Sequence, residues 1–144
     1  MPLELAQIRR RVQTRLADVK RAAAVRRERV AAADQAYDVL LSEIATPVMN
    51  AVAQSLSAEG YAFRVSTPGR TVRMVSDRSS RTYLELRLDT TGASPQVMLD
   101  VCRERGSRVL ADEHPVGRGA QVDTLTEEDV LATVLESLDE LLER

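Results

Sequence analysis

The feature that most constrains the fold is an uninterrupted helical stretch near the start of the chain. The 43 residues from Leu3 to Ala45 contain no glycine and no proline and are rich in alanine. Apolar residues recur at every third or fourth position, the period of an amphipathic helix. At about 1.5 Å per residue this helix is roughly 65 Å long, whereas a compact chain of this size has a diameter of about 40 Å. We therefore expect the helix to project beyond the rest of the fold.

The apolar residues of this helix follow a seven-residue repeat, which is the pattern of helices that pair in coiled coils. Only Arg9 and Arg26 interrupt it. Because an apolar seam is unfavourable in water, a second copy of the chain or another helical protein is expected to cover it. The residues predicted to bind this partner are Val12, Leu16, Val19, Ala23, Val30, Ala33, Tyr37, Leu40 and Ile44. The alternative is a break near residues 26–29 that folds the segment into a hairpin, although no Gly, Pro or Asn marks a turn there.

Charge is distributed unevenly, although the formal net charge is only −2. Residues 9–29 contain nine basic groups and two acidic ones, whereas residues 123–143 contain eight acidic groups and no basic one. Nonspecific binding to the phosphates of nucleic acid is therefore an alternative function. The residues that would bind are Arg9, Arg10, Arg11, Arg15, Lys20, Arg21, Arg26, Arg27 and Arg29. A solvated helix surface explains the same charges, and the chain has no zinc-finger spacing and no aromatic-rich strand for base stacking.

The remainder of the chain predicts an α+β fold. Thr46-Pro47 indicates an N-cap and the first residue of a short second helix, which should stop at Gly60. After Gly60 the apolar residues alternate, beginning with Tyr61, and turn sequences separate about five strands of an antiparallel meander. Residues 112–123 are expected to be irregular, and Thr124 and Glu127 to form the capping box of a C-terminal amphipathic helix. Residues 1–59 would form a helical segment, and residues 60–144 the sheet with its C-terminal helix.

The hairpin between the second and third strands has a preferred register. Pairing Val72 with Leu88 and Met74 with Leu86 brings apolar side chains together on one face. The opposite face, mixed in character and predicted to be wet, would then carry Arg73, Val75, Tyr83, Glu85 and Arg87.

No group of residues predicts a catalytic or metal site. Asp77 and Glu85-Leu86-Arg87 resemble a degenerate Asp…Glu-x-Lys pattern of restriction-type nucleases, but Arg87 replaces the lysine, and a guanidinium does not readily change its protonation state. His114 follows Asp112-Glu113 directly, and since adjacent residues of an extended loop point apart, we expect a solvated loop. Cys102 has no histidine at a recognisable spacing and is expected to be inert.

Composition and length favour a single soluble domain. The 44% of apolar residues suffice for a core, and the single cysteine excludes an internal disulfide. No apolar run reaches the roughly 20 residues of a membrane span, and the first residues lack the features of a signal peptide. We therefore expect a cytoplasmic, non-enzymatic interaction or assembly module without cofactor, metal or membrane contact, as a homo-oligomer or bound to a helical partner. A nuclease-like enzyme is a further alternative.

Overall fold

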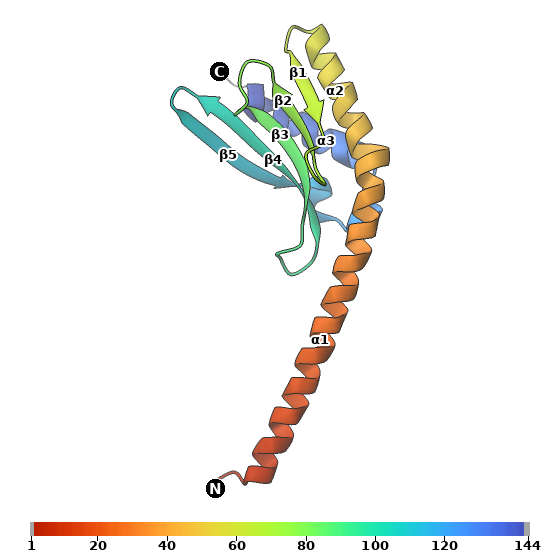
Figure 1. Ribbon diagram of the computed structural model, residues 1–144, viewed down its shortest axis with the longest axis vertical. Helices are drawn as coiled ribbons and strands as arrows, with labels where there is room; N and C mark the ends of the chain where they lie inside the picture. The colour runs from red at the N-terminus through yellow and green to blue at the C-terminus, as the bar shows by residue number, and fades with distance from the viewer. Residues whose placement is uncertain (1, 143–144) are drawn as a thin grey trace.

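The computed structural model describes residues 2–142, which form one long helical rod, a five-stranded sheet and a C-terminal helix (Figure 1). The rod consists of α1 (Leu5–Leu40), a π-helical turn (Leu41–Ala45) and α2 (Thr46–Ala58). The strands are β1 (Phe63–Ser66), β2 (Val72–Ser76), β3 (Tyr83–Asp89), β4 (Gln96–Arg105) and β5 (Arg108–Pro115), and each pairs antiparallel with its neighbour in sequence. Short 3-10 segments (Val116–Gly119 and Val122–Thr124) lead to α3 (Glu127–Leu142). The predicted α+β fold with a meander sheet is confirmed.

The core lies between one face of the sheet and the helices. Because side chains alternate along a strand, every second residue of β2, β3 and β4 points to this face. In Figure 1, α3 lies behind the sheet and α2 runs beside β1. The fully buried side chains come from all of these elements and include Tyr37, Met49, Met74, Leu84, Leu86, Leu99, Val130 and Val134. The long rod and the sheet therefore share a single hydrophobic core.

The rod does not restart at Thr46, which corrects the predicted N-cap. Thr46 has helical backbone angles, and its N–H donates to the carbonyl oxygen of Leu41, five residues earlier. This is the π-helical bond, one residue wider than the α-helical one. Pro47 has no N–H to donate, and in a regular α-helix its ring would collide with the carbonyl group of Glu43. We attribute the wider turn to this proline, which the helix passes without ending.

The β2–β3 hairpin differs from the predicted register by two residues. Val72 lies opposite Leu86, and Met74 lies opposite Leu84. The loop is tighter than expected, because the N–H of Ser76 already donates to the carbonyl oxygen of Thr82. A shift of two residues leaves every side chain on its face, so the assignment of faces holds although the pairs do not.

Three predictions at the ends of elements were also wrong. Asp112 and His114 lie in β5, which continues to Pro115, so the irregular segment is shorter than expected. The capping box is formed by Thr126 and Asp129, whose side chains exchange hydrogen bonds with each other's backbone N–H groups at 3.2 and 2.9 Å. Tyr61 is exposed and precedes β1. Local propensity identified each element but did not fix where it begins or ends.

Candidate protein interface on the first helix

Helix α1 leaves the rest of the fold partway along its length. It runs unbroken through residues 26–29, so the alternative hairpin does not form. Near this point Arg26 donates to the carbonyl oxygens of Gly92 and Thr90 in the β3–β4 loop, at 2.9 and 2.7 Å. Residues 5–21, which we call the arm, extend past this loop into solvent (Figure 1). At about 1.5 Å per residue the arm is roughly 25 Å long.

The upper part of α1 is fixed to the sheet through Tyr37. Its side chain is fully buried, and its hydroxyl donates to the carbonyl oxygen of Arg70 at 2.6 Å and lies 3.3 Å from that of Leu86. The Arg70 guanidinium stacks over the Tyr37 ring and forms ion pairs with Asp34 and Asp38, which lie on either side of Tyr37 in α1. These ion pairs are exposed and contribute little to stability by themselves, so the buried ring is the main anchor of this part of α1.

Stability is expected to fall in alkali because of Tyr37. Burial raises the pKa of its phenol above the ordinary value of 10.0, so the folded chain keeps a proton that the unfolded chain releases. This contribution is complete below about pH 10 and is lost as the pH rises towards the folded-state pKa. Urea denaturation at pH 9, 10 and 11 should show that the free energy of unfolding falls as the pH rises, and that it falls less steeply in Tyr37→Phe. Some decline should persist, because a hydrogen bond with the Cys102 thiol and burial raise the pKa of Tyr83 to about 12. A decline of the same slope in both proteins would contradict this assignment.

The residues of the predicted partner-binding seam fall into three groups by burial. Ala33, Tyr37 and Leu40 are buried in the chain's own core, which corrects their assignment to a partner. Ala23, Val30 and Ile44 are half-buried, and Ile44 packs against the same core. Val12, Leu16 and Val19 are 50%, 51% and 56% exposed. The helical periodicity therefore did not reveal where the chain's own core stops covering the seam.

The exposed apolar residues of the arm form one stripe. We call Leu5, Ile8, Val12, Leu16 and Val19 the arm stripe; each of these side chains is exposed. At 100° per residue they occupy an arc of about 80° around the helix. Ile8 was missed by the seven-residue repeat, although it lies three residues after Leu5 and four before Val12. The arm thus presents a continuous apolar face on a rigid helix.

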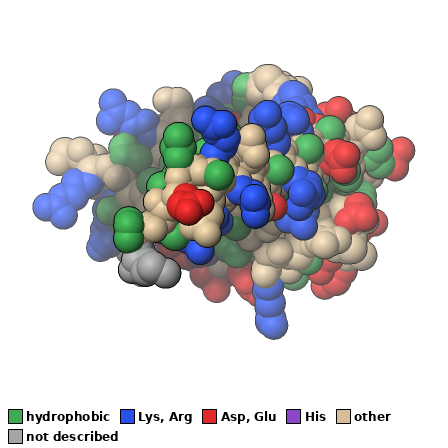
Figure 2. Space-filling model, turned by 90° about the horizontal axis from the view of Figure 1, so that it is seen from below, with side chains coloured by type: hydrophobic (Ala, Val, Ile, Leu, Met, Phe, Trp, Pro, Cys, Tyr) green, Lys and Arg blue, Asp and Glu red, His purple; other side chains and the backbone are tan. Residues whose placement is uncertain are grey.

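Basic residues border the stripe on both sides. Arg9 and Lys20 lie along one edge of the arc, and Arg15 lies along the other, by the same angular count. Arg10, Arg11 and Arg21 occupy the remaining surface, where Arg21 forms an exposed ion pair with Asp18 at 3.3 Å. Figure 2, which views the molecule from below, shows Lys and Arg side chains on several sides of it. The positive charge of the arm is spread around the helix and is not gathered on one face.

The remaining basic residues lie where α1 meets the domain. Arg26, Arg27 and Arg29 are exposed. Arg29 lines a hollow of about 470 Å³ between α1 and the segments containing Pro95 and Gln121. Since Arg26 is bound to the β3–β4 loop, it is not available to a phosphate without giving up those hydrogen bonds.

The nuclease-like residues are not brought together. Glu85 lies opposite Arg73 and accepts a hydrogen bond from its guanidinium at 2.8 Å, while Asp77 pairs with Arg64. Arg73 and Asp77 are four residues apart along β2 and the loop that follows it, so Glu85 and Asp77 are separated by about 13 Å along the strand direction. In the predicted register they would have been diagonal neighbours. The two-residue shift therefore moves these two carboxylates apart.

Two further findings bear on the kind of protein this is. Within residues 2–142, no helix combines the length and apolar character needed to cross a membrane. The chain matches no protein-family model, no curated protein and no solved structure.

Proposed function

We propose that the chain is a non-enzymatic interaction module whose arm binds an acidic amphipathic helix of another protein. The single observation that carries this proposal is the arm stripe, an exposed apolar face bordered on both edges by basic residues. Apolar residues spaced by three and four along a straight helix match the knobs-into-holes packing of a second helix. Contiguous exposed apolar surface on a soluble protein marks such a docking site.

Charge favours an acidic partner over a second arm. In the seven-residue repeat, certain positions lie directly beside the apolar seam. Between residues 8 and 29, none of these flanking positions holds an acidic residue. Two parallel arms would place Arg15 of one copy beside Lys20 of the other, and Arg9 beside its own counterpart. Glutamate or aspartate at the flanking positions of a partner would replace this repulsion with ion pairs. Homo-oligomerisation through the arms is therefore the less favourable form of the same function.

The acidic helix α3 of a second copy is also a poor partner. Its apolar residues Val130, Val134 and Leu141 are already buried against the chain's own sheet. Acidic groups such as Glu128 and Glu136 remain exposed on α3. The only large apolar side chain exposed beside them on this helix is that of Leu135. A partner that covers the stripe must supply both an apolar seam and negative flanks, and α3 offers only the second.

The charge complementarity can be tested with two synthetic helical peptides that share a leucine seam and differ only at the flanking positions. The peptide with glutamates there should bind, with an affinity that falls as salt is added, while the peptide with lysines should not. Fluorescence anisotropy of labelled peptides measures both affinities. Light scattering after size exclusion should give the mass of a monomer without peptide.

A matched pair of triple variants separates this function from nucleic-acid binding. Arg9→Gln/Arg15→Gln/Lys20→Gln removes three charges beside the stripe, whereas Arg10→Gln/Arg11→Gln/Arg21→Gln removes three from the rest of the arm. Only the first set should weaken binding of the glutamate peptide. Equal binding of both peptides, or a dimer that strengthens with salt, would overturn the proposal. Submicromolar binding of duplex DNA at physiological salt, weakened equally by both sets, would favour the nucleic-acid function.

A further inference from the structure

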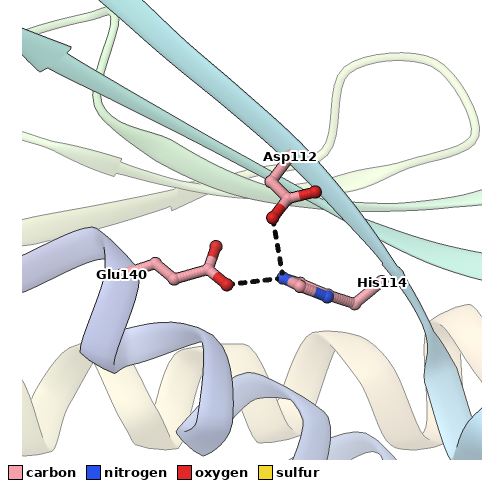
Figure 3. A group of neighbouring side chains, drawn as sticks. All are labelled: Asp112, His114 and Glu140. Carbon is pink, nitrogen blue, oxygen red and sulfur yellow. Dashed lines mark hydrogen bonds and ion pairs between the residues drawn. The ribbon is translucent and has the colours of Figure 1, made fainter.

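Three potential metal ligands converge where the edge of the sheet meets the end of α3. Asp112 and His114 are two residues apart on β5 and therefore point to the same side of the strand. This is the side of the helices, because β5 places Asp112 opposite Val101 and His114 opposite Leu99, both buried in the core. Glu140 reaches the same place from the last part of α3 (Figure 3). The geometry points to a site for a divalent transition-metal ion, with Zn²⁺ the ion that fits best.

The distances suit a tetrahedral ion. The Nε2 atom of His114 lies 2.9 Å from Oε1 of Glu140 and 3.8 Å from Oδ2 of Asp112, and one ligand atom from each residue lies within 4.8 Å of the others. Two ligands bound to Zn²⁺ at about 2.1 Å and at the tetrahedral angle are about 3.4 Å apart. The observed spacings lie on either side of this value, so rotations of the exposed carboxylates suffice to bring all three onto one ion.

The charge of the site also favours a cation. Among residues 2–142, the ion pairs of Asp112 and Glu140 are both with His114, so two carboxylates share one imidazole. Glu136 lines the same hollow as His114 and Glu140, one helical turn before Glu140. Arg103 and Arg118 line the two hollows beside the site and oppose a cation. We expect these two guanidinium groups to weaken the affinity for a cation.

The site is open enough to admit an ion and its remaining ligands. Hollows of about 220 and 450 Å³ adjoin it, one lined by Asp112 and Glu140 and the other by His114 and Glu140. Three protein ligands leave a fourth tetrahedral position for water. An imidazole with two carboxylates favours Zn²⁺ or Mn²⁺ over Mg²⁺ and Ca²⁺, which prefer oxygen ligands alone.

Calorimetric titration of the full chain with ZnCl₂ tests the site. The titration uses the Cys102→Ser background, because a free thiol binds Zn²⁺ independently. One equivalent of Zn²⁺ should bind, and Mg²⁺ should bind far more weakly. His114→Ala and Glu140→Gln should each lower the Zn²⁺ affinity by more than about 10- to 100-fold, the loss found when only an outer contact of a metal site is removed. Glu113→Gln is the matched control, because Glu113 points to the other face of β5 and pairs with Arg87.

Thermal unfolding provides an independent measurement. Since the ion would join β5 to α3, Zn²⁺ should raise the melting temperature of the parent protein and of Glu113→Gln but not of Glu140→Gln. The proposal is overturned if Zn²⁺ does not bind, or if His114→Ala and Glu140→Gln bind it as tightly as the parent. In either case the cluster is an ion pair between an imidazole and two carboxylates.

Discussion

Replacing Tyr37 with alanine is expected to lower the free energy of unfolding by about 3–5 kcal/mol, the cost of removing a large aromatic side chain from a core. The ring is fully buried at the point where α1 meets the sheet, and its hydroxyl donates to the carbonyl oxygen of Arg70. Removal leaves a cavity beneath the helix and breaks the hydrogen bond from Tyr37 to the β1–β2 loop. Urea denaturation followed by circular dichroism measures the change.

Two companion substitutions divide this loss into its parts. Tyr37→Phe keeps the ring and removes one hydrogen bond, so it should cost only about 1 kcal/mol. Leu16→Ala removes an apolar side chain from the same seven-residue repeat, but on the exposed arm, and should cost no more than about 0.5 kcal/mol. If Leu16→Ala were as costly as Tyr37→Ala, the arm would have to be covered in the free protein, and the arm stripe would not be available to a partner.

The contrast between Tyr37 and Leu16 shows how far the sequence predicts this fold. The absence of glycine and proline over 43 residues and the helical period were sufficient to predict the long first helix, and the alternation after Gly60 was sufficient to predict the meander. Both signals are local, because they depend on residues within one or two turns or one strand. Whether a seam residue is covered depends on where the sheet ends beside the helix, which is a property of the whole fold.

The errors have similar physical origins. The register of β2 and β3 depends on how the loop from Asp77 to Arg81 closes, and two registers that differ by two residues place the same side chains inside. Pro47 was interpreted as a helix start because proline is favoured at first positions, but it is equally compatible with a π-helical turn inside a longer rod. In both cases the local sequence permits two structures, and packing selects one.

The metal-ligand cluster was missed for a related reason. Asp112 and His114 have the spacing that puts two side chains on one side of a strand, but residues 112–115 were assigned to a loop, where this spacing has no meaning. Glu140 follows His114 by 26 residues and meets it only because α3 packs back over the sheet. The alternation in β5 could have been recognised from the sequence, whereas the third ligand required the tertiary structure.

Replacing three residues of the arm stripe is expected to weaken partner binding strongly without unfolding the protein. In Val12→Gln/Leu16→Gln/Val19→Gln, each half-exposed side chain loses about 1 kcal/mol of the apolar burial that a bound helix would provide. The sum of about 3 kcal/mol corresponds to a loss of affinity of about 100-fold. Glutamine has a higher helix propensity than valine, so the arm should stay helical. Fluorescence anisotropy of the glutamate-flanked peptide measures this decrease in affinity.

The control for this variant is Val39→Gln. Val39 is 53% exposed, as the replaced residues are, but its position on α1 lies far around the helix from the arm stripe by the angular count of 100° per residue. It should change neither the peptide affinity nor the melting temperature. If the triple variant had a lower melting temperature than the parent, these residues would have to be packed in the free chain. A triple variant that keeps both its stability and its full peptide affinity would leave the basic residues alone as the binding surface and remove the apolar stripe from the proposed function.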